Sequence, residues 1–381
     1  MFNLNKFIGE HVTHRAESMF AADISANSAT LSAEIKDKKV CVIGGAGSIG
    51  SSFIKAVLRF EPKSMVVVGL NENGLAELVR DVRSTDGLFV PDEFRCYTLN
   101  FADPIFERIF HEEKGFDIVA NFSAHKHVRS EKDRYSVQAL IENNDIKAKR
   151  LMDLLCVYPP RHFFCVSTDK AANPVNIMGA SKRLCEMIVQ MINDRSATEY
   201  VAVRFGNVLG SAGSVIPLFR KQIRSGGPVT VTDKRVIRYF MTIPEAVQLI
   251  FQAGAYARGG EIFVLDMGEP VCIDDLARNM IRLSGFEPDV DIPIEYTGLR
   301  PGEKLYEELL LSGEGMQKTK NDLIYIGHEI AFDPAAFEEN LMLLRAIPET
   351  DEPALRAKLR EMVPTFHAPD GQTLPQEATV G

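Results

Sequence analysis

The feature that most constrains the fold is a glycine-rich turn between an apolar strand and an apolar helix. The segment reads Lys39-Val-Cys-Val-Ile-Gly-Gly-Ala-Gly-Ser-Ile-Gly50, and its glycines at 44, 47 and 50 are spaced GxxGxxG. Glycines permit a tight turn and let backbone N–H groups and a helix N-terminus approach a pyrophosphate. A glycine triplet alone is weak evidence, but this placement indicates a dinucleotide-binding unit. The candidate cofactor-binding residues here are Gly44, Gly47, Ser48, Ile49 and Gly50.

Strands and helices alternate after this turn. Apolar runs predict strands at 64–71, 94–103, 116–125, 162–167 and 199–206, and helical patterns lie between them. This alternation predicts an α/β fold, a doubly wound parallel sheet of the Rossmann type. After Asn207, glycines and Pro228 interrupt the rhythm, which indicates a smaller, interleaved substrate-binding lobe. We expect an N-terminal arm at 1–37, a dinucleotide-binding domain at 38–210 and 239–266, the lobe at 211–238 and 267–367, and a disordered tail at 368–381.

The ends of the second and third strands suggest where the adenosine half of the cofactor lies. An acidic residue after the second strand usually accepts from the ribose of NAD, whereas a basic one accommodates the phosphate of NADP. Here the position is Gly69 or Asn71, with Glu72 beside it and no basic residue before Arg80, which favours NAD over NADP. Asn100-Phe101 could hold the adenine. The N-terminal arm is expected to be loosely ordered, with a subunit contact as the alternative.

Composition excludes several classes of protein. The formal net charge of −9 with scattered Lys and Arg argues against nucleic acid as a partner. Six cysteines without a CxxC pair are expected to be reduced, which fits the cytoplasm, and no His/Cys spacing indicates a metal. No run of about 18 apolar residues predicts a membrane span, and the N-terminus lacks the apolar core of a signal peptide.

The stretch from Val166 to Lys182 contains the candidate catalytic residues. Its Ser-Thr-Asp-Lys follows a buried strand, at the edge where open α/β sheets hold their ligands. The pattern becomes helical from Ile177, so Met178 and Lys182 share one helix face. Taken alone, a solvated loop explains the stretch equally well.

Eight motifs in order nevertheless identify a family. The chain closely resembles bacterial UDP-N-acetylglucosamine 4,6-dehydratases of the polysaccharide-biosynthesis type, within the extended short-chain dehydrogenase/reductase superfamily. The likeness covers roughly residues 38–312. The motifs are Gly44-Gly-Ala-Gly-Ser-Ile-Gly50, Ser123-Ala-His-Lys-His-Val128, Ser167-Thr-Asp-Lys-Ala-Ala-Asn-Pro174, Arg204-Phe-Gly-Asn-Val-Leu-Gly210, Gly226-Gly-Pro-Val-Thr-Val-Thr232, Arg238-Tyr-Phe-Met-Thr-Ile-Pro244, Glu261-Ile-Phe-Val-Leu-Asp-Met-Gly268 and Gly298-Leu-Arg-Pro-Gly-Glu-Lys-Leu-Tyr-Glu-Glu-Leu309.

This sequence departs from the family pattern in two ways. The superfamily usually carries Tyr-x-x-x-Lys, but here Met178 precedes Lys182, and methionine cannot ionise. Met at this position resembles the branch that retains configuration at C5 of the sugar, whereas Tyr resembles the inverting branch. The second departure is the lack of the membrane-spanning region that many longer relatives have before the glycine-rich turn, so we expect a soluble protein.

The resemblance implies a role for each candidate residue. Lys170 would be the base at C5 of the sugar and Asp169 the acid at the C6 hydroxyl. Lys182 would hold the nicotinamide ribose. Further cofactor contacts would come from Ser123 and Ala124, substrate contacts from Asn207, diphosphate contacts from Arg238 and Arg300, and a cofactor or sugar contact from Lys126, which could equally be a solvated charge.

Two questions stay open at the level of sequence. Lys170 must be neutral and Asp169 protonated, the reverse of what an adjacent ion pair favours. The group that takes the C4 hydroxyl proton in place of tyrosine is Thr168 or Asp169, and we favour Asp169 assisted by Thr168. The alternatives to a retaining dehydratase are an inverting dehydratase, a 4-epimerase, and a catalytically silent dinucleotide sensor. The superfamily usually pairs through helices, so we expect a homo-oligomer.

Overall fold

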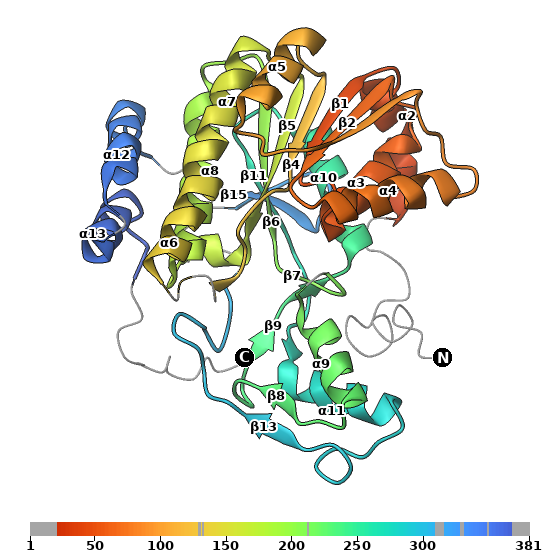
Figure 1. Cartoon of the computed structure of the whole chain (residues 1–381), viewed down its shortest axis with the longest axis vertical. Helices are drawn as coiled ribbons and strands as arrows, with labels where there is room; N and C mark the ends of the chain where they lie inside the picture. Colours follow the sequence, from red (N-terminus) through yellow and green to blue (C-terminus); the bar gives the residue numbers. More distant parts are fainter. Residues whose placement is uncertain are drawn as a thin grey trace.

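The centre of the molecule is a nine-stranded sheet in the order β14-β15-β11-β6-β5-β4-β1-β2-β3 (Figure 1). The computed structural model describes residues 21–128, 131, 133–211, 213–308, 316–327, 331–348 and 350–367. The strands from β3 to β11 run parallel, and β15 and β14 add an antiparallel edge. Their bounds are β1 Lys39–Ile43, β2 Ser64–Gly69, β3 Glu93–Thr98, β4 Ile118–Asn121, β5 His162–Thr168, β6 Glu199–Phe205, β11 Ile262–Leu265, β14 Met316–Lys318 and β15 Ile324–Gly327.

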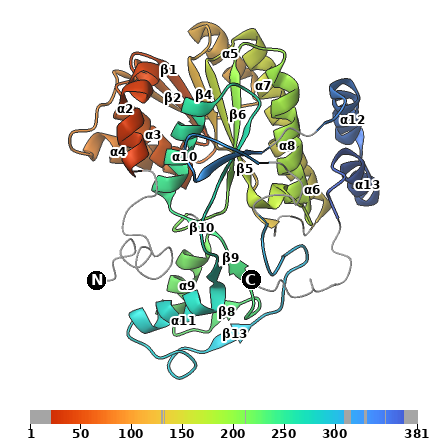
Figure 2. The same ribbon diagram turned by 180° about the vertical axis from the view of Figure 1, so that it is seen from behind.

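Helices cover both faces of the sheet, which confirms the doubly wound fold (Figures 1 and 2). Successive residues of a strand point to opposite faces of the sheet and belong to two hydrophobic cores, so that Cys41 packs on one face and Val42 on the other. One face carries α2 Ala21–Ile35, α3 Ser48–Leu58, α4 Glu72–Ser84 and α10 Ile243–Tyr256; the other carries α5 Pro104–Glu113, α6 Arg134–Ile141, α7 Lys147–Val157 and α8 Ile177–Asn193.

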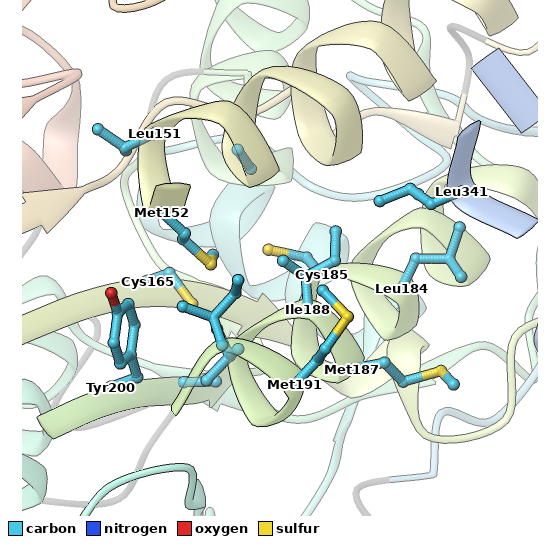
Figure 3. Packing of buried hydrophobic residues seen from close by; sticks show 14 of the residues in the cluster. Leu151, Met152, Cys165, Leu184, Cys185, Met187, Ile188, Met191, Tyr200 and Leu341 are labelled. Atoms are coloured by element: carbon cyan, nitrogen blue, oxygen red, sulfur yellow. The ribbon is translucent and has the colours of Figure 1, made fainter. Parts of the chain in front are cut away.

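Helix α8 is buried along almost its whole length. Its apolar side packs on β5, β6 and α7, where Met152, Cys185 and Ile188 meet (Figure 3). A C-terminal pair of helices, α12 Pro334–Ala346 and α13 Glu352–Met362, covers the outer side and contributes Leu341 to the same core. Helix α8 therefore faces the chain's own C-terminal helices on its outer side.

The smaller lobe has its own core and lies below the carboxyl ends of the strands in Figure 1. The chain enters and leaves it beside a parallel pair formed by β7 and β10. Short strands pair as β9 with β12 and β8 with β13, and two helices cover them. The bounds are β7 Asn207–Val208, α9 Val215–Arg224, β8 Val229–Val231, β9 Ile237–Arg238, β10 Phe240–Met241, β12 Val271–Cys272, α11 Ile273–Leu283 and β13 Ile294–Tyr296.

Two segments differ from the sequence-based division. Residues 267–367 were assigned to the smaller lobe, whereas β14, β15, α12 and α13 lie on the large sheet and its helical face. Part of the expected loose arm is helix α2, whose Leu31 and Ile35 are buried against the sheet domain. The physical reason is the same in both cases. Each segment buries apolar side chains against the large sheet domain, and the strands of that sheet are far away in the sequence. Residues 1–20 and the tail 368–381 lie outside the described residues.

The helical pattern between the predicted strands at 116–125 and 162–167 forms helices α6 and α7 with an interruption between them. A π-helical turn, η2 Glu142–Ile146, separates α6 from α7. Such turns often occur at functional sites because they widen the helix and redirect side chains. Among the residues that the structure describes, no helix is long and apolar enough to cross a membrane.

Candidate active site

The glycine-rich turn packs tightly against the residues that follow β4. Gly44 has φ +76°, and a Cβ added there would lie 2.7 Å from the backbone nitrogen of Ser123. A Cβ on Gly50 would lie 2.5 Å from the carbonyl oxygen of Gly44. Helix α3 begins at Ser48, directly after Gly47, so its first turn and the glycine backbone face one small region. This arrangement fits a pyrophosphate, because helix N-terminal N–H groups bind anions.

The candidate adenosine residues follow the neighbouring strands β2 and β3. Asn71 is exposed and caps α4 by accepting from Gly74 N at 3.0 Å. Asn100 Oδ1 accepts from Ala102 N at 3.0 Å. Phe101 is buried in the sheet core. The structure therefore brings Asn71 and Asn100 to the same edge as the glycine turn, and the adenine contact from Phe101 stays a prediction.

The predicted catalytic residues lie together where β5 ends. Thr168 is the last strand residue, and Asp169 and Lys170 begin a single 3-10 turn, η3 Asp169–Ala171. Asp169 Oδ1 accepts from Thr168 Oγ1 at 2.7 Å, from Lys170 N at 2.9 Å and from Lys170 Nζ at 3.0 Å. Asp169 is buried, and its Oδ2 has no hydrogen-bond partner among the described residues. One carboxylate oxygen is therefore saturated with donors, whereas the other is enclosed by the protein without a partner among the described residues.

A carboxylate that the sequence analysis did not single out faces the same lysine. Glu307 Oε1 lies 3.7 Å from Lys170 Nζ, although the two residues are far apart in the sequence. Loss of water lowers the pKa of Lys170, but the charges of Asp169 and Glu307 outweigh it, so the pKa is raised. Burial raises the pKa of Glu307. Glu307 belongs to the motif that begins at Gly298, yet no local spacing links it to Lys170.

Arg238 organises the loop that carries Glu307. Its Nη1 donates to the carbonyls of Ile237 and Leu305, and its Nη2 donates to Lys304 O at 2.8 Å and to Glu303. The Nε lies 3.8 Å from Glu307 Oε1. All three guanidinium nitrogens thus face the protein itself, and a diphosphate would have to displace some of these contacts. Arg300 is exposed on the same loop, so the diphosphate role predicted for both arginines is easier to fulfil there.

Met178 lies in the first turn of α8 and is buried. Its backbone N–H donates to Glu131 Oε1 at 2.8 Å, so a glutamate from the segment before α6 reaches the helix N-terminus. Burial raises the pKa of Glu131, although backbone N–H groups oppose the shift. Glu131 is the second carboxyl that the sequence analysis missed, since nothing in its local pattern indicates a cap on a distant helix.

Lys182 lies one turn farther along α8 and points toward the sheet. Its Nζ donates to the carbonyl oxygen of Val166 at 2.9 Å. The π-helical turn supports this region, because Asn144 Nδ2 donates to His125 O and Asn144 Oδ1 accepts from His125 N, each at 2.9 Å. Asn144 also donates to Ser181 Oγ at 3.1 Å. The turn therefore ties α8 to the loop that follows β4.

The remaining candidate residues lie around this centre. Asn207 is partly buried in β7 and donates to Tyr239 O at 3.2 Å. Lys126 is exposed on the loop after β4, and partial loss of water around its ammonium lowers its pKa. Among the described residues no cluster of His, Cys, Asp and Glu could hold a metal ion. The roles of these side chains toward a ligand stay predictions.

A separate ion-pair network lies beneath the site. Glu186 on α8 accepts from Ser167 Oγ at 2.6 Å and from Arg204 Nε at 2.8 Å. Its second oxygen accepts from Arg183 Nη1 and Arg204 Nη2, each at 2.9 Å. Burial would raise the pKa of Glu186, but the two arginines lower it to about 2. The network joins α8, β5 and β6 directly below Thr168.

Comparisons with known proteins agree with this arrangement. Residues 40–329 match the family described as polysaccharide biosynthesis protein. The probable polysaccharide biosynthesis protein EpsC of Bacillus subtilis is 41% identical over 336 residues, which are 88% of this chain and 55% of EpsC. The chain thus spans about half the length of that relative. The UDP-N-acetylglucosamine 4,6-dehydratase (inverting) of Campylobacter jejuni is 28% identical over 282 residues, 73% of this chain and 78% of the relative.

A solved structure extends the likeness to the fold. Pen from Bacillus thuringiensis superposes with a TM-score of 0.68 at 32% sequence identity. The match covers 77% of this chain and 89% of Pen.

Proposed function

Since the chain belongs to the polysaccharide biosynthesis protein family, we propose that it is an NAD-dependent nucleotide-sugar 4,6-dehydratase. Its substrate would be UDP-N-acetylglucosamine and its product a UDP-4-keto-6-deoxy-N-acetylhexosamine with the configuration at C5 retained. The observation that carries the proposal is the cluster of buried Asp169 with partly buried Thr168 and Lys170, beside a helix that has Met178 in its first turn. That cluster offers a proton acceptor and a second titratable group for elimination.

The dinucleotide would lie along the glycine turn, with Asn71 and Asn100 near its adenosine half and Lys182 near the nicotinamide ribose. When bound, it would take a hydride from C4 of the sugar and later return it at C6. The close packing of Gly44 and Gly50 supports this placement, because a side chain at either position would collide with the backbone and displace the turn from the helix N-terminus. NAD is preferred to NADP because no basic residue follows β2 directly.

Asp169 would serve twice in the reaction. As an anion held by Thr168 Oγ1, it accepts the C4 hydroxyl proton through its unpartnered Oδ2. The protonated carboxyl then gives this proton to the C6 hydroxyl, which leaves as water. Each transfer needs the substrate oxygen within hydrogen-bond reach, about 2.6–3.2 Å. A side chain that is already positioned can perform both steps without exchange with solvent.

Lys170 would remove the C5 proton once C4 is a ketone. Its neutral amine forms a bond to that proton, and the electrons of the C–H bond pass into the ketone. After water has left, the ammonium returns a proton to C5 from the same side, which retains the configuration. Met178 favours this outcome because it offers no second acid on the opposite face.

An inverting dehydratase or a 4-epimerase is the alternative, supported by the inverting Campylobacter relative. The test is incubation with UDP-N-acetylglucosamine in deuterated water, followed by mass spectrometry and proton NMR of the product. Loss of one water with the original C5 configuration is expected. Inversion at C5, or an epimer of unchanged mass, would contradict the proposal. A protein that binds NAD and leaves the sugar unchanged would be a sensor rather than an enzyme.

The wider setting stays predicted as well. We propose a cytoplasmic homo-oligomer that supplies sugars for surface glycans, with a UDP-sugar as its ligand and no nucleic-acid partner. Size-exclusion chromatography with light scattering measures the oligomeric state directly.

A further inference from the structure

The loop at residues 298–308 connects the two lobes beside the active site. Arg238 of the smaller lobe holds its backbone through the carbonyls of Lys304 and Leu305. On the other side, Asn176 Nδ2 donates to Gly302 O at 3.0 Å and Asn173 Nδ2 donates to Glu308 at 3.2 Å. Both asparagines lie between Lys170 and α8. The loop is therefore anchored to both lobes at the point where it passes Lys170.

Glu307 is the side chain that this loop turns toward the active site. Its side chain is only 5% exposed, and its Oε1 lies 3.7 Å from Lys170 Nζ and 3.8 Å from Arg238 Nε. These distances are ion-pair contacts beyond ordinary hydrogen-bond length. Asp169, by comparison, lies 3.0 Å from the same ammonium. Lys170 thus has one close carboxylate and one more distant, loosely held one.

The charges around Glu307 come from several elements. Burial raises its pKa, Lys170 lowers it, Asp169 raises it, and Arg238 and Lys304 lower it, with a raised pKa as the result. Glu303 faces the far side of Arg238 and takes up part of that positive charge. Burial and Arg238 lower the pKa of Lys170, whereas Asp169 and Glu307 raise it. A buried carboxyl and a buried ammonium in contact share their protons as a unit.

We propose that Glu307 Oε1, which lies 3.7 Å from Lys170 Nζ, closes to hydrogen-bond distance and accepts a proton from the Lys170 ammonium, which leaves Lys170 as a neutral amine. This inference rests on the proposed function, in which Lys170 is the base at C5. In this step one N–H bond of the ammonium breaks and one O–H bond forms on Glu307. The electron pair of the N–H bond stays on nitrogen, and no oxidant or other reactant takes part.

Asp169 is less suited to this task, although it is closer. Its Oδ1 already accepts from three donors, and these hydrogen bonds stabilise the charged carboxylate. The proposed reaction also needs Asp169 free to take the C4 hydroxyl proton. Among the described residues Glu307 has two long ion-pair contacts, so a proton on it disturbs few bonds there. The loop therefore supplies a second carboxyl, which raises the pKa of Lys170 while it is charged and leaves the amine neutral once it has accepted the proton.

The first experiment compares pH profiles of kcat for the wild type and Glu307→Gln. The kcat of the wild type should be constant near neutral pH, giving a plateau. The reason is that the proton moves from Lys170 to Glu307 and is not lost to solvent. In Glu307→Gln the ammonium can lose its proton only to solvent. We expect kcat at neutral pH to fall about 100-fold, the lower range for acid–base groups, and log kcat to rise with pH with a slope of about one.

The matched control is Glu308→Gln, which changes the neighbouring exposed carboxyl that accepts from Asn173. It should keep the plateau. If Glu307→Gln lowers kcat but also keeps the plateau, Glu307 only positions the loop and the inference is overturned. If the wild type makes no dehydrated product while it binds NAD, the proposed function fails instead.

A second measurement needs neither substrate nor a variant. The rate at which a small acylating reagent modifies Lys170 in the wild type is followed by mass spectrometry across the pH range. Because only the neutral amine reacts, a shared proton gives a rate that is independent of pH near neutrality. A rate that rises about tenfold for each pH unit, as for an ordinary lysine, would overturn the inference.

Discussion

Two clusters of charged side chains, one around Glu186 and one around Lys170, adjoin neighbouring residues of β5. They differ in how many hydrogen bonds their carboxylates accept. Glu186 accepts four hydrogen bonds of 2.9 Å or less, three of them from arginines. Glu307 has two ion-pair contacts at 3.7 and 3.8 Å. The adjacent strand residues Ser167 and Thr168 point to opposite clusters, Ser167 to Glu186 and Thr168 to Asp169.

The difference shows how one fold can hold both a fixed charge and an exchangeable proton. Saturation by arginine forks holds the pKa of Glu186 at about 2, so its charge does not change near neutral pH. Burial without saturation moves the pKa of Glu307 in the opposite direction. We therefore expect changes in the Glu186 cluster to alter stability, and changes in the Lys170 cluster to alter catalysis.

The largest expected effect is on turnover. Lys170→Met removes the proposed base, and loss of an acid–base group should lower kcat about 10⁴-fold. The free energy of unfolding should also fall, because the carboxylates of Asp169 and Glu307 lose their ammonium partner, but the folded variant should still show the loss of turnover. Steady-state product formation and urea unfolding measure the two quantities. A variant that turns over at the wild-type rate would show that Lys170 is structural. Asp169→Asn tests in the same way the group proposed to carry the proton from the C4 to the C6 hydroxyl.

The next effect is on stability. Glu186→Gln leaves Arg183 and Arg204 buried without their carboxylate, and breaking a buried ion pair costs about 3–5 kcal/mol. The control is Glu338→Gln, whose carboxylate bonds Arg195 and Lys149 at a partly exposed position. Exposed pairs contribute roughly 0–1 kcal/mol, so this variant should unfold near the wild-type midpoint. Equal losses from both variants would contradict the contrast between the clusters.

The pH dependence of stability should reflect the same contrast. The pKa of Glu186 is lowered from 4.5 to about 2, so its contribution is fully present above pH 4.5 and is lost as pH falls through 2. Linkage puts this contribution at roughly 3 kcal/mol. Glu307 acts with the opposite sign, since its raised pKa makes the charged form unfavourable at higher pH. Urea unfolding at several pH values measures the fall in the free energy of unfolding at low pH. Glu186→Gln should remove the part of this fall that is due to Glu186, and Glu307→Gln should not.

The smallest expected effect concerns the contact between the turn η3 and the first turn of helix α8. A Cβ on Gly179 would lie 2.4 Å from the carbonyl oxygen of Lys170, so Gly179→Ala must push α8 away from η3. Overpacking of this kind costs about 1–3 kcal/mol. In Gly69→Ala the new Cβ meets only Leu75 at 3.8 Å, an ordinary contact. Thermal unfolding of both variants should separate them, and equal midpoints would show that the helix adjusts freely.

Much of the fold follows from local patterns. The apolar strands and the glycine turn predicted the doubly wound sheet, and the position of Thr168, Asp169 and Lys170 after β5 placed them at its carboxyl edge. The expected third strand was too long, since β3 ends at Thr98. These predictions work because a strand, a turn and a helix start each depend on neighbouring residues.

Tertiary structure decided the protonation environment of the site. Glu307, Glu131 and the partners of Glu186 are brought in from segments far apart in the sequence, and no period or spacing records such contacts. The same is true of α12 and α13, whose apolar faces are complete only when α8 is present. Sequence alone determined which residues can donate or accept protons. Only the folded chain determined which of them are saturated and which can move a proton, because that depends on distances across two lobes.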